Sequence, residues 1–422
     1  MRLEFVAIGV AGVAMVTWAS RPDGTKTPTV PKKPTYATDV APLLNARCVT
    51  CHHPGEVAPF SLVGYDNAKK WSKMAATVTE QRKMPPWKAV AGFGEHLDAN
   101  VLSPDEIALL SAWSKAGAPA GDLKKAPPTP TFSSAWALGN PDLVIQPTRD
   151  FKLEAEGQDI YRNFLVRNDS AETRWVEAMD VKPGNPKVVH HVIVWLDGMN
   201  KAPALEEAQK DGQEGYISSG GGAGFIPTGS FGGWAPGLRA RRTAPGTAFK
   251  LAPGANLVIQ VHYHKSGKPE IDRTRVGLYF AKEKPAREMK LAWLANFGID
   301  IAPGKVTPTR FEQKFPVPVT IYSVMPHMHL LGRKMKSWLV FPDGTTKPLV
   351  EVDDWDFNWQ LNYALKEPIT APAGTKIVVE GEFDNTAENP RNPSDPPKRV
   401  RWGEETTDEM FLLVTSYTLA LP

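Results

Sequence analysis

From about residue 133 to its end, the chain alternates short apolar segments with turn-forming residues. Segments such as DLVIQP, KVVHHVIVWL, NLVIQVHYH and KIVVEGEF are rich in β-branched and aromatic residues, and proline or glycine separates them. Heptad repeats and long amphipathic helical patterns are absent from this part of the sequence. Short strands joined by turns over about 290 residues predict one or two antiparallel β-sandwiches.

The first 24 residues have the pattern of an export signal. Arg2 precedes an apolar stretch from Phe5 to Ala19, and Thr17 and Ala19 are placed like a small-residue cleavage site. The stretch is shorter than the roughly 20 residues that a membrane-spanning helix needs, so a cleaved signal peptide is favoured over an uncleaved membrane anchor. We therefore expect the rest of the chain to be periplasmic or otherwise exported.

Both cysteines of the chain, Cys48 and Cys51, lie in a C-x-x-C-H motif that His52 completes. This spacing suits two thioether bonds to a haem, with the histidine as an axial ligand. The alternatives are a redox dithiol or half a zinc site, but no second cysteine pair is present to complete a zinc site. Helical patterns flank the motif, and SPDEIALLSAWSKAG has a serine cap and a terminal glycine. We expect a small α-helical cytochrome c-like domain with one haem at residues 25–122.

Met84 is the expected second axial ligand of this haem. It lies in RKMPPW, where two prolines favour an extended loop that could place a thioether over the haem. Met74 lies within a helical pattern and is more simply interpreted as core packing, and His53 and His96 as exposed or peripheral. The proline-rich segment that follows is assigned to a linker, residues 123–139.

Histidines beyond the linker occur in close pairs. The chain has nine histidines, and six of them lie in this region, as His190/His191, His262/His264 and His327/His329. Residues two apart in a strand share a face, so an H-x-H pair could bind one metal ion. For any single pair, coincidence or a hydrogen-bonded core histidine is the simpler explanation. Three pairs together indicate a metal site.

The identity of the metal follows from the ligands that remain. Thiolate copper sites need a cysteine, and both cysteines are assigned to the haem. A site of histidines, alone or with a thioether, suits zinc or copper. A redox haem on the same chain favours copper, because zinc does not transfer electrons.

Four motifs of the β region occur in the order VVHHVIVW, LVIQVHYH, MPHMHLLG and TTDEMFLL. With them, residues 140–422 resemble the type II copper, ascorbate-dependent monooxygenases, which include peptidylglycine α-hydroxylating monooxygenase and dopamine β-monooxygenase. The resemblance implies two jelly-roll-like β-sandwich domains, residues 140–290 and 291–422, and two copper ions. One copper would be bound by His190, His191 and His262, and the other by His327, His329 and Met410.

The resemblance also carries consequences for single residues. His190 and His191 would face the same copper, which predicts a bulged strand, whereas His264 would contact solvent or a ligand and not the metal. Peptide-amidating members place an arginine where this chain has Met325 and a tyrosine where it has Val414, so peptidylglycine is not the expected substrate. The animal enzymes are also cross-linked by disulfide bonds, whereas this β region has no cysteine.

The activity implied is hydroxylation of a C–H bond of a small organic substrate by O2 at the copper of His327, His329 and Met410. An external donor, an ascorbate-like reductant or a redox protein, would supply electrons, which the haem supplies or relays. The net charge of +3 gives no reason to expect a nucleic-acid partner. The alternatives are a non-catalytic haem and copper electron-transfer protein, a zinc hydrolase fused to a cytochrome, and a sandwich that only binds carbohydrate or protein. Residues 353–363, DDWDFNWQLNY, either line a substrate pocket or form a turn into a half-buried strand.

Overall fold

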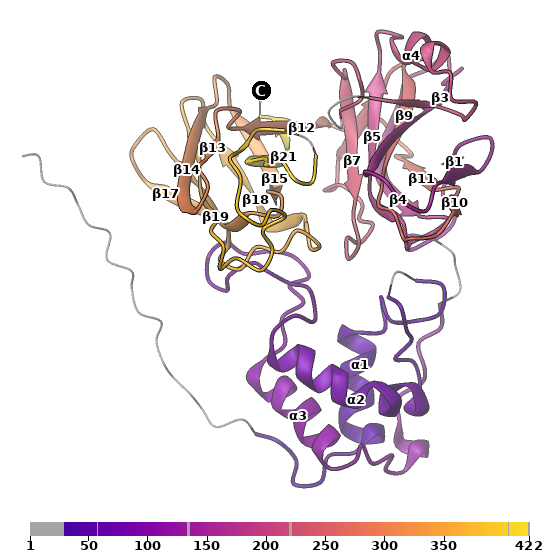
Figure 1. Ribbon diagram of the computed structural model, residues 1–422, viewed down its shortest axis with the longest axis vertical. Helices are drawn as coiled ribbons and strands as arrows, with labels where there is room; N and C mark the ends of the chain where they lie inside the picture. Colours follow the sequence, from indigo (N-terminus) through magenta and orange to yellow (C-terminus); the bar gives the residue numbers. More distant parts are fainter. Residues whose placement is uncertain (1–28, 57, 133–135, 219–221, 404, 421–422) are drawn as a thin grey trace, which may run out of the picture.

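The computed structural model describes residues 29–56, 58–132, 136–218, 222–403 and 405–420. It is mostly β-sheet, and Figure 1 shows a helical unit next to two β units. Within the described residues, no helix has the length and the apolar composition needed to cross a bilayer. The expected export signal, residues 1–24, lies outside them.

The helical unit is built around a small apolar core that includes Val40, Leu44, Leu110 and Trp113. Its elements are η1 (Tyr36–Val40), α1 (Ala41–Arg47), α2 (Tyr65–Glu80), α3 (Pro104–Lys115) and η2 (Leu123–Lys125). The predicted cap of α3 is confirmed: the Ser103 hydroxyl accepts from the Glu106 amide at 3.1 Å, and the Glu106 carboxylate accepts from the Ser103 amide at 2.7 Å.

The first β unit packs a five-stranded sheet, ordered β6-β3-β9-β5-β7, around a core that includes Val192, Leu257 and Ile259. Strand β9 is buried along its whole length, since it lies between β3 and β5. The elements of this unit are β1 (Leu143–Ile145), β2 (Phe151–Leu153), β3 (Ile160–Val166), β4 (Arg174–Lys182), β5 (Val189–Asp197), α4 (Ala202–Ala208), β6 (Tyr216–Ile217), β7 (Gly229–Trp234), β8 (Thr247–Leu251), β9 (Asn256–Tyr263), β10 (Glu270–Asp272) and β11 (Arg275–Phe280).

The second β unit has its own four-stranded sheet, ordered β14-β19-β16-β17, and a separate core that includes Ile321, Val379 and Phe411. Its strands are β12 (Arg287–Ala295), β13 (Asp300–Ile301), β14 (Lys305–Lys314), β15 (Val319–His327), β16 (Gly332–Val340), β17 (Thr346–Val352), β18 (Tyr363–Ala371), β19 (Lys376–Asn385), β20 (Val400–Arg401) and β21 (Leu412–Leu419). Two apolar cores with antiparallel sheets are consistent with the predicted β-sandwiches.

Strand β12 joins the two β units. Residues 287–289 pair with β8 of the first unit, and residues 290–295 pair with β21 of the second. One eight-stranded sheet, β1-β11-β4-β8-β12-β21-β15-β18, therefore runs through both units. The predicted domain boundary at 290/291 falls inside this shared strand, and backbone hydrogen bonds fix the position of one unit against the other.

The helical unit is held against both β units. A segment that follows α2, residues 87–98, is called here the docking segment. Its Val90 amide donates to the Glu351 carbonyl at 2.8 Å, and its Leu97 amide donates to the Ala364 carbonyl at 2.8 Å. On the other side, Lys182 of β4 pairs with Glu56 at 2.7 Å, five residues beyond Cys51.

His96, which we expected to be exposed or peripheral, is a half-buried part of the docking segment. Its Nε2 atom donates to the Leu349 carbonyl at 2.8 Å, and its ring packs against Tyr363 with the ring centroids 5.3 Å apart. The expectation was wrong because the segment leaves the helical unit and packs on the second β unit.

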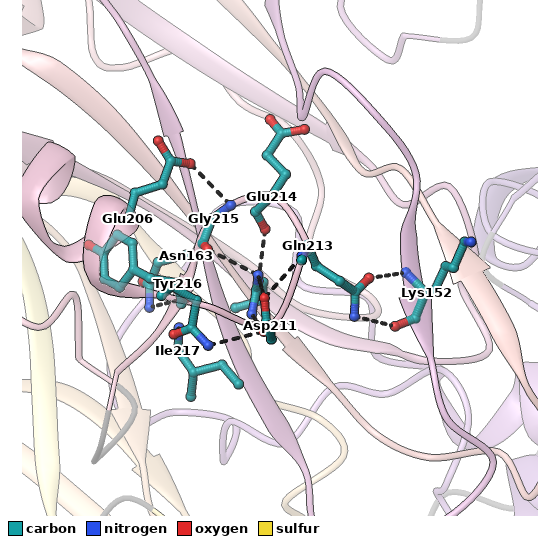
Figure 2. Close-up of polar contacts among 12 residues, drawn as sticks. Lys152, Asn163, Glu206, Asp211, Gln213, Glu214, Gly215, Tyr216 and Ile217 are labelled. Atoms are coloured by element: carbon teal, nitrogen blue, oxygen red, sulfur yellow. Dashed lines mark hydrogen bonds and ion pairs between the residues drawn. The ribbon is translucent and has the colours of Figure 1, made fainter.

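A buried arginine holds the loop between α4 and β6 to the first β unit. The Arg162 side chain is fully buried, and it donates to Asp211 at 2.5 Å and to the Glu214 carbonyl at 2.8 Å. Figure 2 shows Asp211 and Gln213 in this loop, with the Gln213 amide bonded to the backbone of Lys152 at 2.9 and 3.1 Å. In a unit without cysteines, this hydrogen-bonded cluster ties the loop to β2 and β3.

Candidate metal centres

The first group of histidines lies on the neighbouring strands β5 and β9. His191 and His262 are paired across these strands, and the register shifts between Val189 and His191. The bulge predicted at the histidine pair is therefore confirmed. It lets His190 and His191 direct their rings towards His262, although adjacent strand residues normally face opposite sides.

The ring nitrogens of these three histidines have the spacing of metal ligands. Nδ1 of His191 lies 3.3 Å from Nδ1 of His190 and 3.4 Å from Nδ1 of His262, and the ligand atoms of all three lie within 4.8 Å of one another. Metal–nitrogen bonds of about 2.0 Å in a tetrahedron place ligand nitrogens about 3.3 Å apart. One ion can therefore bind all three nitrogens.

Two neighbours fix the ring of His262. Tyr161 stacks on it with the centroids 4.2 Å apart and the planes 14° apart, and Nε2 donates to the Asp159 carboxylate at 2.8 Å. The Nδ1 atom is left to face His191. His264 also donates to Asp159, at 3.0 Å, and its side chain is 69% exposed. It therefore shares the carboxylate that bonds to His262 and does not itself join the three candidate ligands.

The protonation states suit metal binding. Burial, followed by the neighbouring His262, lowers the pKa of His190 to about 3 and takes the pKa of His191 well below its usual value. Burial would raise the pKa of Asp159, but the hydrogen bonds from His262 and His264 lower it to about 2. The imidazoles of His190 and His191 are thus neutral near pH 7, as metal ligation requires.

The second group of histidines lies at the end of β15 and in the turn that follows. The rings of His327 and His329 are 5.1 Å apart. Nδ1 of His327 donates to Oε1 of Gln360 at 2.5 Å, and Nδ1 of His329 donates to the Asp408 carbonyl at 3.2 Å. Both Nε2 atoms remain for a metal, and burial lowers the pKa of His327 to about 4 and that of His329 to about 3.

Glu409 connects the turn of His329 to Met410. Its carboxylate accepts from the backbone amides of His329 at 2.8 Å, Leu331 at 2.6 Å and Met410 at 3.2 Å. The side chain is fully buried, and burial raises its pKa to about 8, against the lowering effect of these amides. The contacts hold two candidate ligands that lie 81 positions apart in the sequence.

Both groups open onto one cavity of about 740 Å³ between the two β units. The candidate ligands that line it are His191, His262, His327, His329 and Met410. Its walls also include the apolar side chains of Met289, Leu291, Trp293, Met325, Leu412 and Val414.

Phe357 lies between the two groups. Its ring stacks on His190 with the centroids 4.8 Å apart and meets His329 edge-on at 5.7 Å. Both interpretations of residues 353–363 apply: Phe357, Gln360 and Asn362 line the cavity, and the segment forms a turn that leads into the half-buried strand β18.

The comparison with known families bears on this geometry. Residues 307–417 match the copper type II ascorbate-dependent monooxygenase, C-terminal domain. The match contains His327, His329 and Met410, and it supports copper and a monooxygenase. The helical unit and the first β unit lie outside the matched residues.

Other comparisons add little. A search of curated proteins found no match. The major capsid protein P2 from bacteriophage PM2 is 9% identical, with a TM-score of 0.27 over 66% of this chain and 98% of that chain. The structure of PNGF-II is 8% identical, with a TM-score of 0.25 over 66% of this chain and 64% of that chain. These TM-scores are too low to support a conclusion.

Three residues of the two centres were missed by the sequence analysis: Asp159, Gln360 and Glu409. Glu409 stands beside Met410 in the motif that indicated the second centre, so a local signal for it existed. Asp159 lies 103 positions before His262, and Gln360 lies 33 positions after His327. Nothing in the local sequence marks either as a partner of a histidine.

The candidate haem motif has free thiols and a suitably oriented histidine. Cys48 and Cys51 form no disulfide, and they follow α1 in a continued helical turn, with the His52 amide donating to the Cys48 carbonyl at 3.0 Å. Nδ1 of His52 donates to the Phe60 carbonyl at 3.1 Å. Nε2 is therefore left for an axial bond, and these residues fit a c-type haem.

The methionine candidates differ in their surroundings. Met84 follows α2, is half-buried and lies three residues before the start of the docking segment. Met74 on α2 is 48% exposed, so its interpretation as core packing was wrong: it lies on the face of α2 that points away from the core residue Ala68. No contact in the described residues assigns Met84 to the haem, and its role as axial ligand stays a prediction.

Proposed function

We propose that this chain is an exported, copper-dependent monooxygenase that hydroxylates a C–H bond of a small, apolar organic substrate with O2. The observation that carries the proposal is that two groups of candidate copper ligands, from two β units, line one largely apolar cavity. The family match over residues 307–417 supports the chemistry of the second group. Export rests on the signal-like pattern of residues 1–24.

The residues of the two centres have separate roles in this proposal. His190, His191 and His262 would hold one copper, and His327, His329 and Met410 would hold the other, which would supply the O2 chemistry. Bound copper supplies one-electron transfer and the activation of O2; a thioether ligand favours the reduced ion.

Apolar side chains in the cavity wall support the proposal of an apolar substrate. Met325 and Val414 present apolar surface at the positions where the amidating enzymes bind a peptide carboxylate, and Leu412 and Trp293 extend it. Burial of a substrate against such walls favours an apolar molecule. Phe357 packs against both His190 and His329 and adds an apolar ring to the cavity wall.

The helical unit is proposed to carry one c-type haem on Cys48, Cys51, His52 and Met84. This haem would supply or relay electrons from an external donor, either an ascorbate-like reductant or a redox protein. The contacts of Glu56 with Lys182 and of the docking segment with β17 and β18 support the relay, because they hold the unit against both β units. Reduction of the haem that is not followed by reduction of copper would contradict it.

The first experiment is elemental analysis of protein matured with its haem, together with electron paramagnetic resonance. We expect one iron and two coppers per chain with a type II copper signal, and substrate-dependent O2 uptake when apolar C–H compounds are screened. Iron with zinc would favour the zinc hydrolase, whose three-histidine site the geometry of the first centre also fits. Copper that is reduced and reoxidised without substrate-dependent O2 uptake would favour the non-catalytic electron-transfer protein. Iron without copper or zinc would mean that the histidines do not bind metal.

A further inference from the structure

Asp159, directly before β3, contacts a candidate ligand of the first centre and the loop that contains Met410 of the second. Its carboxylate accepts from Nε2 of His262 at 2.8 Å and from Nδ1 of His264 at 3.0 Å. It also accepts from the hydroxyl of Thr406 at 3.3 Å, a residue of the second β unit. The Asp159 side chain is only 16% exposed, so these three groups are its main partners.

The contact with His262 selects one of two ring orientations. Stacking on Tyr161 fixes the plane of the imidazole, but a half-turn about the Cβ–Cγ bond keeps this plane and exchanges the positions of nitrogen and carbon atoms. A carboxylate accepts hydrogen bonds only, so it favours the orientation with Nε2–H towards Asp159. Nδ1 then faces His191 at 3.4 Å, where the first centre needs it.

The contact with Thr406 reaches the loop of the second centre. Thr406 lies between β20 and β21, in the loop that also contains Asp408 and Met410. The Asp408 carbonyl accepts from Nδ1 of His329, and Met410 is a candidate ligand. A hydrogen bond to Thr406 therefore restrains the same loop that orients one ligand of the second centre and supplies another.

We propose that Asp159 is a positioning residue for both copper centres: it orients His262 for the first and, through Thr406, couples the first centre to the Met410 loop of the second. This inference rests on the proposed function, because it presupposes copper at both centres. Carboxylates bonded to ligating histidines fix ring orientation and raise metal affinity. A restraint shared by two sites couples their binding free energies, and the coupling is reciprocal.

The first test is the copper affinity of Asp159→Asn, measured by competition with a chelator while electron paramagnetic resonance distinguishes the centres. We expect the affinity of the first centre to fall about 10- to 100-fold with changed copper hyperfine parameters. His264→Ala, which removes the exposed partner of the same carboxylate, is the matched control. It should leave the copper affinity and the hyperfine parameters of the first centre unchanged. Asp159→Glu keeps the charge and should retain more affinity than D159N, which makes the test usable even if D159N folds poorly.

The second test addresses the coupling. The copper affinity of the second centre is compared between wild type and His191→Ala, which empties the first centre, and the comparison is repeated with Thr406→Val on both backgrounds. We expect H191A to lower the second-centre affinity by roughly 5-fold or more with Thr406 present, and to have no effect with T406V. Thr407→Val, on the exposed neighbour, should behave as wild type.

The outcomes separate this inference from the proposed function. Wild-type protein that binds no copper would overturn the proposed function itself. Copper at both centres with unchanged affinity and spectra in D159N would overturn the orienting role. An equal effect of H191A with and without the Thr406 hydroxyl would overturn the coupling.

Discussion

Oε1 of Gln360 lies 2.5 Å from Nδ1 of His327 and accepts its hydrogen bond. The other side of the same amide is also fixed, since its Nε2 donates to the Phe357 carbonyl at 3.0 Å. The glutamine side chain is buried, with 6% exposed, so it cannot rotate freely. His327 is therefore held with Nε2 turned towards the candidate metal.

Gln360→Leu removes this acceptor while keeping a side chain of similar size. We expect the copper affinity of the second centre to fall about 10- to 100-fold, because an unrestrained imidazole binds less well, and the first centre to be unchanged. Copper titration with spectroscopic discrimination of the centres measures both. Gln313→Leu, at an exposed position on β14, is the control; equal affinities in Q360L and wild type would contradict an orienting role for Gln360.

Met410→Leu tests the thioether. The exchange nearly conserves volume, so the protein should lose less than about 1.5 kcal/mol of stability. If Met410 ligates the copper at which O2 reacts, substrate-dependent O2 uptake should be lost while the spectrum of the first centre persists. Leucine at Met335, a buried residue of β16 away from the cavity, provides the control. Full substrate-dependent O2 uptake in M410L would contradict the role of Met410 as a ligand of this copper.

Glu409→Gln replaces a fully buried carboxyl group whose oxygens accept from three backbone amides. The glutamine side chain keeps one acceptor oxygen, but its NH2 group replaces the other and faces backbone N–H groups, which are also donors. We expect a loss of about 2 kcal/mol in the free energy of unfolding of the second β unit, the usual cost of an unsatisfied buried group. Denaturant unfolding and the copper content of the second centre report the result. Glu312→Gln, at an exposed ion pair with Lys376, should cost far less, and equal effects of the two changes would argue against this role.

Arg162→Met removes the buried cation of the first β unit and leaves the carbonyls of Glu214 and Gly215 without a donor. We expect a loss of about 3 kcal/mol in the free energy of unfolding of that unit. Arg310→Met removes an exposed arginine paired with Glu380 and Glu312 and should cost less than about 1 kcal/mol. Urea unfolding followed by tryptophan fluorescence compares the two. Similar midpoints for R162M and wild type would show that the loop is held by other contacts.

Serine in place of Cys48 and Cys51 tests the haem and its independence from copper. The helical unit and each β unit have separate apolar cores, so copper content should stay at the wild-type level while covalent haem is lost. Denaturing electrophoresis with haem staining detects the covalent haem, and elemental analysis gives copper. Covalent haem that survives the double substitution would contradict the proposed attachment.

The sequence by itself determined the local features of this protein. Runs of β-branched residues between prolines and glycines predicted strands, and β5 and β9 are such strands. The S-P-D-E pattern predicted the start of α3. These features depend on residues a few positions apart, so backbone sterics and side-chain alternation decide them without knowledge of the rest of the chain.

The candidate ligands could also be selected in advance, because they occur in short motifs that resemble those of a known family. Their partners could not. Asp159 meets His262 only because β3 and β9 are paired, and Gln360 meets His327 only because residues 357–360 fold back over the end of β15.

Only the tertiary structure decided how the units combine. Strand β12 carries one sheet through both β units, the docking segment leaves the helical unit to pair with β17 and β18, and Thr406 reaches Asp159 across 247 positions. Such contacts bring together residues that are remote in the sequence, and their free energy comes from burial and hydrogen bonds that exist only once both partners are folded. A local pattern specifies which residues can bind a metal; the packing of the units specifies that two such groups share one cavity.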